Sequence, residues 1–228
     1  VKALQDTAET QTRAWLEKYH GQIKLLGDAR QAVYDDIRGQ AREPELTPTE
    51  LRTNQRVEGG TAEGEKLPRY PKHVLADGEG QWPLDPKFTS WEKDVLAQEL
   101  DRSSVVAWYR NPSDAGKHSI RVPYRKDGLW KSLQPDFIFF DTNAGGQIVP
   151  SIVDPHSGSF TGALERLEGL ARYAEEHGAI YARIDAIDEG RDKTLRSLDL
   201  KDPAVRAAIL AAEKDGKSAA DLFNGPQS

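Results

Sequence analysis

Two short apolar runs separated by turn-forming residues constrain the fold of this chain more than any other feature. Residues 134–140 and 147–156 are each of strand length, and each carries an acid at one end. The segment between them reads Asp-Thr-Asn-Ala-Gly-Gly, a cluster of residues that favour turns. Two such runs around such a turn predict a β-hairpin. If the chain folds back about residues 144 and 145, Asp136 lies opposite residue 153 or 154.

The acids of this hairpin define a candidate site. Asp136 begins the first run and Asp154 lies near the end of the second, so the hairpin brings two carboxylates from different parts of the chain close together. Asp154 and His156 are two positions apart, so an extended backbone directs both side chains to the same face. Carboxylate oxygens are the ligands that hard divalent cations prefer. The hairpin therefore predicts a divalent-metal site formed by two carboxylates and a third polar group.

The overall charge and the residue types that are missing restrict the function further. The net charge is −6, which gives no general attraction to nucleic acid, so any DNA contact needs a local basic patch. Without cysteine, neither disulfides nor thiolate zinc sites form. No apolar run reaches membrane length and no signal peptide is evident, so we expect a soluble, cytoplasmic protein. The chain has no methionine and begins with valine, so we expect a piece of a longer protein.

Residues 1–80 are expected to form a helical segment and a linker ahead of the main domain. Apolar side chains recur every three or four positions up to about residue 38, which predicts a helix, and Gly21 and Gly27 indicate a break in it. The stripe consists of Leu4, Ala8, Gln11, Trp15, Tyr19, Ile23, Leu26, Ala29, Val33 and Ile37. Prolines and glycines punctuate residues 39–80, which predicts a linker or a long surface loop. Residues 69–75 at its end are expected to dock on the following domain.

Residues 81–228 are expected to form one α/β domain, a mixed central sheet of about four to five strands flanked by helices and preceded by the N-terminal helical segment. Ser90 is expected to cap a helix that runs to Leu100. Thr161 is expected to cap a second helix that ends at His177, with Gly178 at its C-terminal end. Further strands are predicted at residues 105–110, 118–124 and 179–187, and helical segments at residues 203–214 and 219–223.

This order of elements, together with the placement of the acids, resembles the PD-(D/E)xK nuclease superfamily, which has the restriction-endonuclease-like fold. Pro135-Asp136 matches the PD element, and Asp154-Pro155-His156 matches the (D/E)xK element with histidine where lysine is usual. Glu92 lies where the first helix of that superfamily often carries an acid. Residues 88–187 resemble more narrowly the C-terminal nuclease domain of type III restriction subunits and related phage-defence helicase-nucleases. The resemblance implies that residues 1–80 connect the nuclease domain to a helicase motor.

The resemblance also implies a metal-dependent DNA endonuclease. Asp136 and Asp154 would hold one or two Mg²⁺ or Mn²⁺ ions, with the carbonyl of Pro155 as a further ligand and Glu92 bound through a water. The metal would acidify a water and neutralise charge on the scissile phosphate. His156 would act as imidazolium or as a general base in place of lysine, or would bind a softer metal. Arg166 and Lys131 are the candidates to supply the missing positive charge.

Basic residues near the hairpin are the candidates for contact with the DNA backbone, although a solvated charged face is the competing interpretation. These residues are Arg110, Arg121, Arg125, Lys126 and Lys131. Trp108 and Tyr109 either stack on bases or belong to the core. The expected partners are DNA and a helicase domain of the same chain or complex, and no membrane. A homodimer would cut both strands most easily.

Two other interpretations compete with an active nuclease. A nuclease fold that has lost catalysis and serves as a DNA-binding or scaffolding module is the main alternative, because His156 replaces lysine and the net charge is negative. An unrelated zinc- or manganese-dependent hydrolase is the other, and it is disfavoured because the chain lacks paired-histidine spacings. The single residues also have ordinary roles: an aspartate often caps a turn, and an acid in a first helical turn favours the helix dipole.

Overall fold

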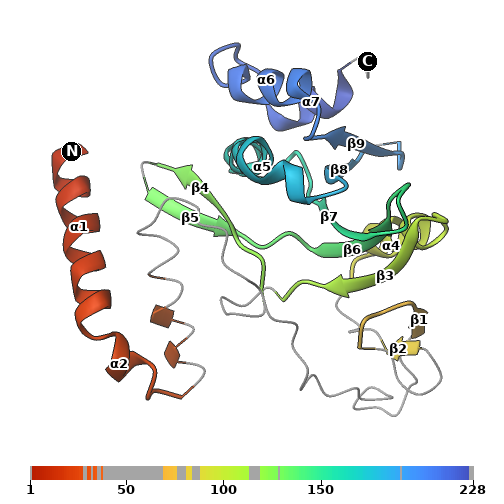
Figure 1. Cartoon of the computed structure of the whole chain (residues 1–228). Coiled ribbons are helices and arrows are strands. Elements are labelled where there is room, and N and C mark those ends of the chain that lie inside the picture. Colours follow the sequence, from red (N-terminus) through yellow and green to blue (C-terminus); the bar gives the residue numbers. More distant parts are fainter. Residues whose placement is uncertain are drawn as a thin grey trace, which may run out of the picture.

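The computed structural model describes residues 2–27, 30–31, 33–34, 37, 69–75, 81–83, 88–112, 119–127, 129–190 and 192–225 of the chain. Its largest feature is a mixed five-stranded sheet (Figure 1). The strands, in spatial order, are β3 (Val105–Arg110), β6 (Phe137–Thr142), β7 (Ile148–Pro155), β8 (Ile184–Glu189) and β9 (Leu195–Asp199). β7 and β8 are parallel, and every other neighbouring pair in this sheet is antiparallel. The sheet confirms the predicted α/β class.

Helices cover both faces of the sheet. α4 (Ser90–Leu100) lies on one face and α5 (Ala163–His177) on the other, with α6 (Pro203–Ala211) and α7 (Ala219–Asn224) beyond α5 (Figure 1). Successive residues of a strand point to opposite faces. Accordingly, Phe137 and Phe139 join the core on the α4 side, whereas Ile138 joins the core on the α5 side. The sheet is therefore the middle of three layers.

β6 and β7 form the predicted hairpin. Phe137 pairs with Val153, so the register places Asp136 beside Asp154, as predicted. The turn is held by Asn143, whose Oδ1 accepts hydrogen bonds from the backbone N–H of Gly145 (2.9 Å) and of Gln147 (3.0 Å). Gly146 follows with a φ of 75°, a left-handed conformation that glycine adopts without strain.

A second hairpin, formed by β4 (Val122–Lys126) and β5 (Leu129–Leu133), packs against α5 outside the central sheet (Figure 1). Of the strand predicted at residues 118–124, residue 118 lies outside the described residues and the strand begins at Val122. Just before it, the side chain of Asn111 binds both the N–H (2.8 Å) and the carbonyl (3.0 Å) of Ile120. β4 approaches α5 closely at Gly169, where a Cβ atom would lie 2.5 Å from the Cβ of Tyr124. β5 and β9 are strands that the sequence pattern did not predict.

Three predicted element boundaries are wrong. The N-cap of α4 is Thr89 rather than Ser90, since Thr89 Oγ1 accepts the N–H of Glu92 while Glu92 Oε2 accepts the N–H of Thr89, a capping box. α5 starts after Gly162, which has a φ of 92° and offers no side-chain cap, so Thr161 does not cap it. β8 starts at Ile184 because residues 178–180 form a 3₁₀ turn.

The N-terminal segment is helical, as predicted, over α1 (Lys2–Lys18) and the short α2 (His20–Ile23). The helix is interrupted at Tyr19, just ahead of Gly21, so the break lies near one of the two predicted glycines. Of the linker predicted at residues 39–80, only residues 69–75 lie within the described part of the chain. Among the helices that are described, none is long and apolar enough to cross a membrane.

Residues 69–75 dock on the sheet, as predicted. β1 (Arg69–Pro71) pairs with β2 (Gln81–Pro83). Directly after β1, the chain runs alongside β3 at His73. Trp108 of β3 holds it there: its backbone N–H donates to the carbonyl of Lys72 (3.0 Å), and its indole Nε1–H donates to the carbonyl of Pro71 (2.8 Å). The N–H of Val74 in turn donates to the carbonyl of Trp108 (3.0 Å). This docked segment extends the edge of the sheet beyond β3.

His73 makes this docked segment sensitive to acid. The side chain is 3% exposed, its ring lies 4.5 Å from that of Trp108, and its Nδ1 accepts the N–H of Leu75 (3.0 Å). Burial lowers the pKa of His73 to about 3. The folded state therefore binds fewer protons than the unfolded chain between that value and about 6.5, so stability falls as the pH drops through this range.

We expect His73→Asn, which keeps a short acceptor but cannot titrate, to flatten the acid side of the stability profile. Wild-type protein should lose about 2 kcal/mol more than the variant between pH 7 and pH 5. Urea unfolding of both proteins at the two pH values measures this difference. Equal losses in the two proteins would show that His73 is not held neutral by the fold.

Candidate metal centre

Three of the predicted site residues meet at one end of the hairpin. Asp136 directly precedes β6, while Asp154 and His156 lie at the end of β7. One potential ligand atom from each residue lies within 4.8 Å of the corresponding atoms of the other two. The predicted proximity of the two carboxylates and the imidazole is therefore confirmed. Pro155 lies between Asp154 and His156 and is buried.

Asp154 is the most buried of the three residues. It is 2% exposed, and its Oδ1 accepts the backbone N–H of Asp136 at 3.1 Å. Its Oδ2 lies 3.6 Å from Nδ1 of His156. The chain after Asp154 is fixed to β8 by the N–H of His156, which donates to the carbonyl of Ile187 (2.8 Å). The position of this carboxylate is thus set by the pairing of β7 with both of its neighbours.

Arg110, at the end of β3, links Asp136 to Glu92 of α4. Its Nη1 lies 2.6 Å from Asp136 Oδ1, and its Nη2 donates to Glu92 Oε1 at 3.0 Å. Burial raises the pKa of Asp136 to about 7, although Arg110 acts in the opposite direction. The other oxygen of Glu92 accepts from Thr89 in the capping box. Glu92 therefore reaches the site through Arg110 and is not part of the three-residue ligand group.

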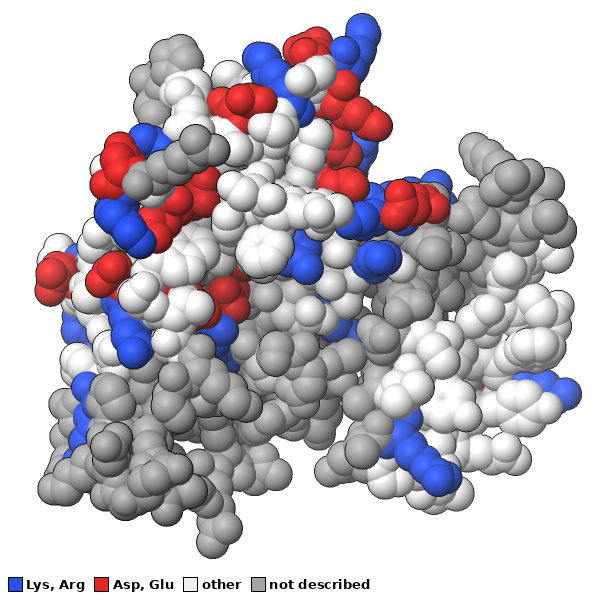
Figure 2. Space-filling view, turned by 180° about the vertical axis from the view of Figure 1, so that it is seen from behind, with Lys and Arg blue, Asp and Glu red and all other residues white. Residues whose placement is uncertain are grey.

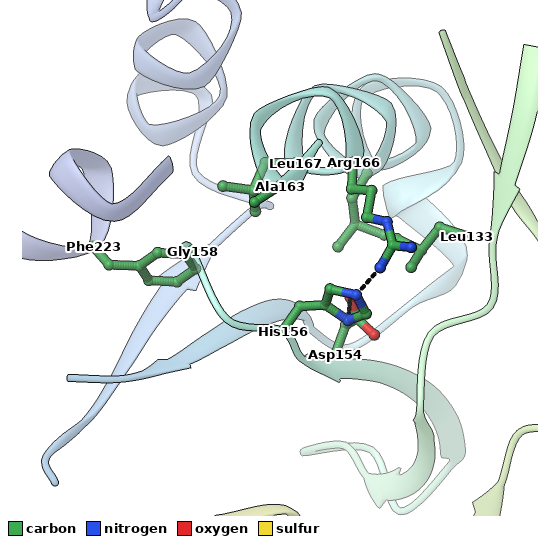
Figure 3. A pocket seen from close by; sticks show the side chains of 9 residues that line it. Leu133, Asp154, His156, Gly158, Ala163, Arg166, Leu167 and Phe223 are labelled. Carbon is green, nitrogen blue, oxygen red and sulfur yellow. Dashed lines mark hydrogen bonds and ion pairs between the residues drawn. The ribbon is translucent and has the colours of Figure 1, made fainter. Parts of the chain in front are cut away.

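His156 lies between Asp154 and a second arginine. The guanidinium of Arg166, in the first turns of α5, meets His156 Nε2 (Figure 3). A guanidinium only donates hydrogen bonds, so Nε2 is the acceptor and the ring proton lies on Nδ1, which faces Asp154. Burial lowers the pKa of His156, but the hydrogen bond and charge of Asp154 outweigh it, so the net pKa is raised. A second proton on the ring would require Arg166 to move away from Nε2.

A small pocket lies between α5 and the end of β7, where Asp154 and His156 lie. Its polar end is formed by Asp154, His156 and Arg166, and its remaining walls are mostly apolar (Figure 3). These walls are Leu133, Gly158, Ala163, Leu167, Leu170 and Phe223. The enclosed space of about 10 Å³ is the size of roughly one water molecule. The pocket thus brings a water-sized space against a carboxylate, an imidazole and a guanidinium.

The donor set fits a divalent cation. Two carboxylates and an imidazole suit Mg²⁺ or Mn²⁺ through oxygen and a softer metal through nitrogen. Nδ1 of His156 faces Asp154 Oδ2 at 3.6 Å, and because this nitrogen carries the ring proton, the imidazole would have to release that proton before it bound a metal. The charge of the site limits the number of ions. With His156 neutral, the carboxylates of Asp136, Asp154 and Glu92 exceed the guanidinium groups of two arginines, Arg110 and Arg166, by one negative charge. The site therefore fits one divalent ion better than two.

The basic residues predicted to contact DNA lie in two parts of the structure. Arg110 is committed to the two acids of the site, and the other four belong to or adjoin the β4–β5 hairpin. Arg125 lies over the ring of Trp130 at 4.9 Å, Lys126 donates to the carbonyl of Thr161 (3.3 Å), and Lys131 is exposed. Arg121 is half-buried. Trp108 and Tyr109 are 0% and 2% exposed and belong to the core, so they do not stack on bases.

The ion pair of Arg110 was missed by the sequence analysis, which assigned this residue to the DNA backbone. A signal for it existed, because antiparallel pairing of β3 with β6 places Arg110 opposite Phe137, the residue after Asp136. Arg166 was one of two candidates for the missing positive charge. The structure brings Arg166 to His156, whereas Lys131 is exposed on β5.

Comparisons with known proteins place the chain beside one family. The YagJ family model matches residues 71–228. Protein YagJ of Escherichia coli (strain K12) is 38% identical to this chain over 209 residues, a match that covers 90% of the chain and 84% of that relative. A search of solved structures finds no match.

Proposed function

We propose that this chain, which belongs to the YagJ family, is a metal-dependent DNA endonuclease domain that hydrolyses phosphodiester bonds. The observation that carries the proposal is the convergence of Asp136, Asp154 and His156 at the ends of two paired strands. Their arrangement on a mixed α/β sheet with a preceding helix agrees with the resemblance drawn from the sequence. Membership of the PD-(D/E)xK superfamily and cleavage of DNA are both proposed.

Each residue of the site has a proposed role. Asp136 and Asp154 bind one Mg²⁺ or Mn²⁺ ion, with the carbonyl of Pro155 as a further ligand. The ion lowers the pKa of a bound water and offsets negative charge on the phosphate. His156 holds a proton at Nδ1 toward Asp154, and Arg110 keeps Asp136 and Glu92 in place.

Arg166 is proposed to supply the positive charge that lysine provides in the related motif. It reaches the pocket from α5 rather than from β7 and meets the far side of the histidine ring. Lys126, which lies beside the start of α5, adds a second cation at this edge. The first turn of α5 has no side-chain cap, and uncapped N–H groups at a helix N-terminus favour an anion such as phosphate.

The biological setting is proposed from the same resemblance. We place the protein in the cytoplasm, in restriction or phage defence together with a helicase. The helicase is proposed as a domain of the same chain or as a subunit of the same complex.

A catalytically inactive DNA-binding or scaffolding module is the second candidate. The observation that favours it is the 2.6 Å ion pair between Arg110 and Asp136, which already neutralises one of the two carboxylates. Such a module would bind DNA equally well with and without metal and would not cut it.

Titration of the full chain with Mg²⁺ or Mn²⁺ in the presence of plasmid, linear duplex and single-stranded DNA tests the proposal. We expect cleavage with either metal and none in EDTA, because both carboxylates need the ion to act on phosphate. Metal-independent binding without cleavage of any of these DNAs would instead support the inactive module.

The role of Arg166 can be tested in the same assay, with Arg172 as the matched control. We expect Arg166→Ala to lower the cleavage rate about a hundredfold and Arg166→Lys to restore part of it, because the lost interaction is a charge in a partly buried site. Arg172→Ala removes an exposed arginine from the same helix and should leave the rate unchanged. A full rate in Arg166→Ala would remove this residue from the proposed mechanism.

A further inference from the structure

Phe160 is a large apolar side chain that stays exposed beside the candidate metal centre. It lies in the loop between β7 and α5 and is 69% exposed. Its ring centroid is 6.5 Å from that of His156. No role in the fold or in the metal site accounts for an aromatic ring at this place.

Hydrogen bonds on both sides fix the loop that carries this ring. The N–H of Gly158 donates to Asp188 Oδ1 of β8 (3.2 Å), and the N–H of Phe160 donates to the carbonyl of Ser157 (3.3 Å). The carbonyl of Phe160 accepts the N–H of Ala163 at the start of α5 (3.0 Å). The backbone of the loop is therefore held in place while the Phe160 ring remains exposed.

Two cations lie close to the loop that carries this ring. Lys126 of β4 donates to the carbonyl of Thr161, the residue after Phe160. Arg166 of α5 contacts His156, whose ring is 6.5 Å from that of Phe160. An exposed aromatic ring near cations is the combination that binds single-stranded nucleic acid, by stacking on a base while the cations contact the backbone.

The charge of the protein argues against a binding mode that depends on phosphates alone. The net charge is −6. On the face shown in Figure 2, the Lys and Arg side chains of the described residues are interspersed with Asp and Glu and form no continuous basic surface. Stacking does not require such a surface, but it does require a base whose face is free, which a base inside a duplex does not offer.

We infer that Phe160 stacks on an unpaired base next to the scissile phosphate, and that the substrate of the site is single-stranded or locally unpaired DNA. This inference rests on the proposed nuclease function for the position of the phosphate. The stacking itself needs neither the metal nor cleavage, so the two can be tested separately.

Binding of a 2-aminopurine-labelled single-stranded oligonucleotide and of its duplex, in EDTA, tests the inference. We expect wild-type protein to quench the 2-aminopurine fluorescence of the single strand and to bind the strand about tenfold more tightly than Phe160→Ala does. Phe160→Tyr should bind like the wild type. Phe160→Leu, which keeps an apolar side chain without a π face, should bind like Phe160→Ala.

Ile148→Ala is the matched control, because Ile148 is 65% exposed at the other end of β7. It should leave binding unchanged. Equal affinity of wild type and Phe160→Ala for the single strand, or an equal loss on the duplex, would overturn the inference. If Phe160-dependent binding occurs without cleavage in Mg²⁺, the stacking role stands and the nuclease proposal fails. If the wild type cleaves DNA in Mg²⁺ and Phe160→Ala binds the single strand as tightly as the wild type, the nuclease proposal stands and the stacking role fails.

Discussion

Asp154→Asn is expected to abolish metal-dependent cleavage of DNA by this protein, with a loss of about a thousandfold or more. Asn keeps an oxygen that can accept the backbone N–H of Asp136, so the hairpin end retains its hydrogen bond. The variant loses the negative charge that the metal requires. The expected effect is therefore on metal binding and rate, with the fold preserved.

Asp136→Asn should remove cleavage to a similar degree but affect stability in the opposite direction. Burial of this carboxylate is unfavourable, as its raised pKa of about 7 indicates, so the metal-free variant should be at least as stable as the wild type at pH 8. Thermal unfolding with and without Mg²⁺ measures both effects. Wild type should gain stability from the ion, whereas both variants should lose most of that gain.

Asp215→Asn, which changes an exposed acid after α6, should retain cleavage and the metal-induced gain. Cleavage at the wild-type rate by either Asp136→Asn or Asp154→Asn would contradict the proposed metal centre. A metal-induced gain that survives in both variants would place the ion elsewhere in the molecule.

The hairpin could be predicted from sequence because its information is local. Two apolar runs, a turn about residues 144 and 145 and two acids in register are all contained in about twenty consecutive positions, and antiparallel pairing converts that register into the proximity of Asp136 and Asp154. The predicted proximity of Asp136 and Asp154 follows from this register.

The remainder of the site depends on contacts between distant parts of the chain. Arg110 reaches Asp136 because β3 pairs with β6, and Arg166 reaches His156 because α5 crosses from β7 to β8. In neither case does the sequence around the arginine show which strand or helix it will meet. A local signal was overlooked at β4 and β5, where Asp127 precedes a glycine in a short turn between two strands and has a φ of 53°.

The largest effect on stability is expected from Arg183→Met. Arg183 precedes β8 and binds both carboxylate oxygens of Glu99 in α4, at 2.6 and 3.1 Å. It also pairs with Asp185 (2.9 Å) and Asp141 (3.4 Å). All three acids are buried, and burial raises the pKa of Asp185 to about 6 although Arg183 acts against the rise. Without Arg183, three buried carboxylates lose their shared counter-charge.

We expect Arg183→Met to lower the free energy of unfolding by about 3–5 kcal/mol at pH 7.5, which corresponds to roughly 10 °C in Tm. The deficit should shrink toward pH 5, because the carboxylates left without a partner can then take up protons in the folded state. Urea and thermal unfolding at both pH values measure it. Arg196→Met is the matched control: Arg196 pairs at 3.0 Å with Asp192, whose side chain is 57% exposed, and should cost about 1 kcal/mol or less.

This cluster lies at the opposite end of β6 from the metal centre, since Asp141 follows Asp136 by five residues, or about 17 Å of strand. Below its Tm, Arg183→Met should therefore keep metal-dependent cleavage and the metal-induced gain in stability. Loss of cleavage in a folded Arg183→Met protein would show that the two ends of the hairpin are coupled. A deficit no larger than that of Arg196→Met would show that the acids around Arg183 do not depend on its charge.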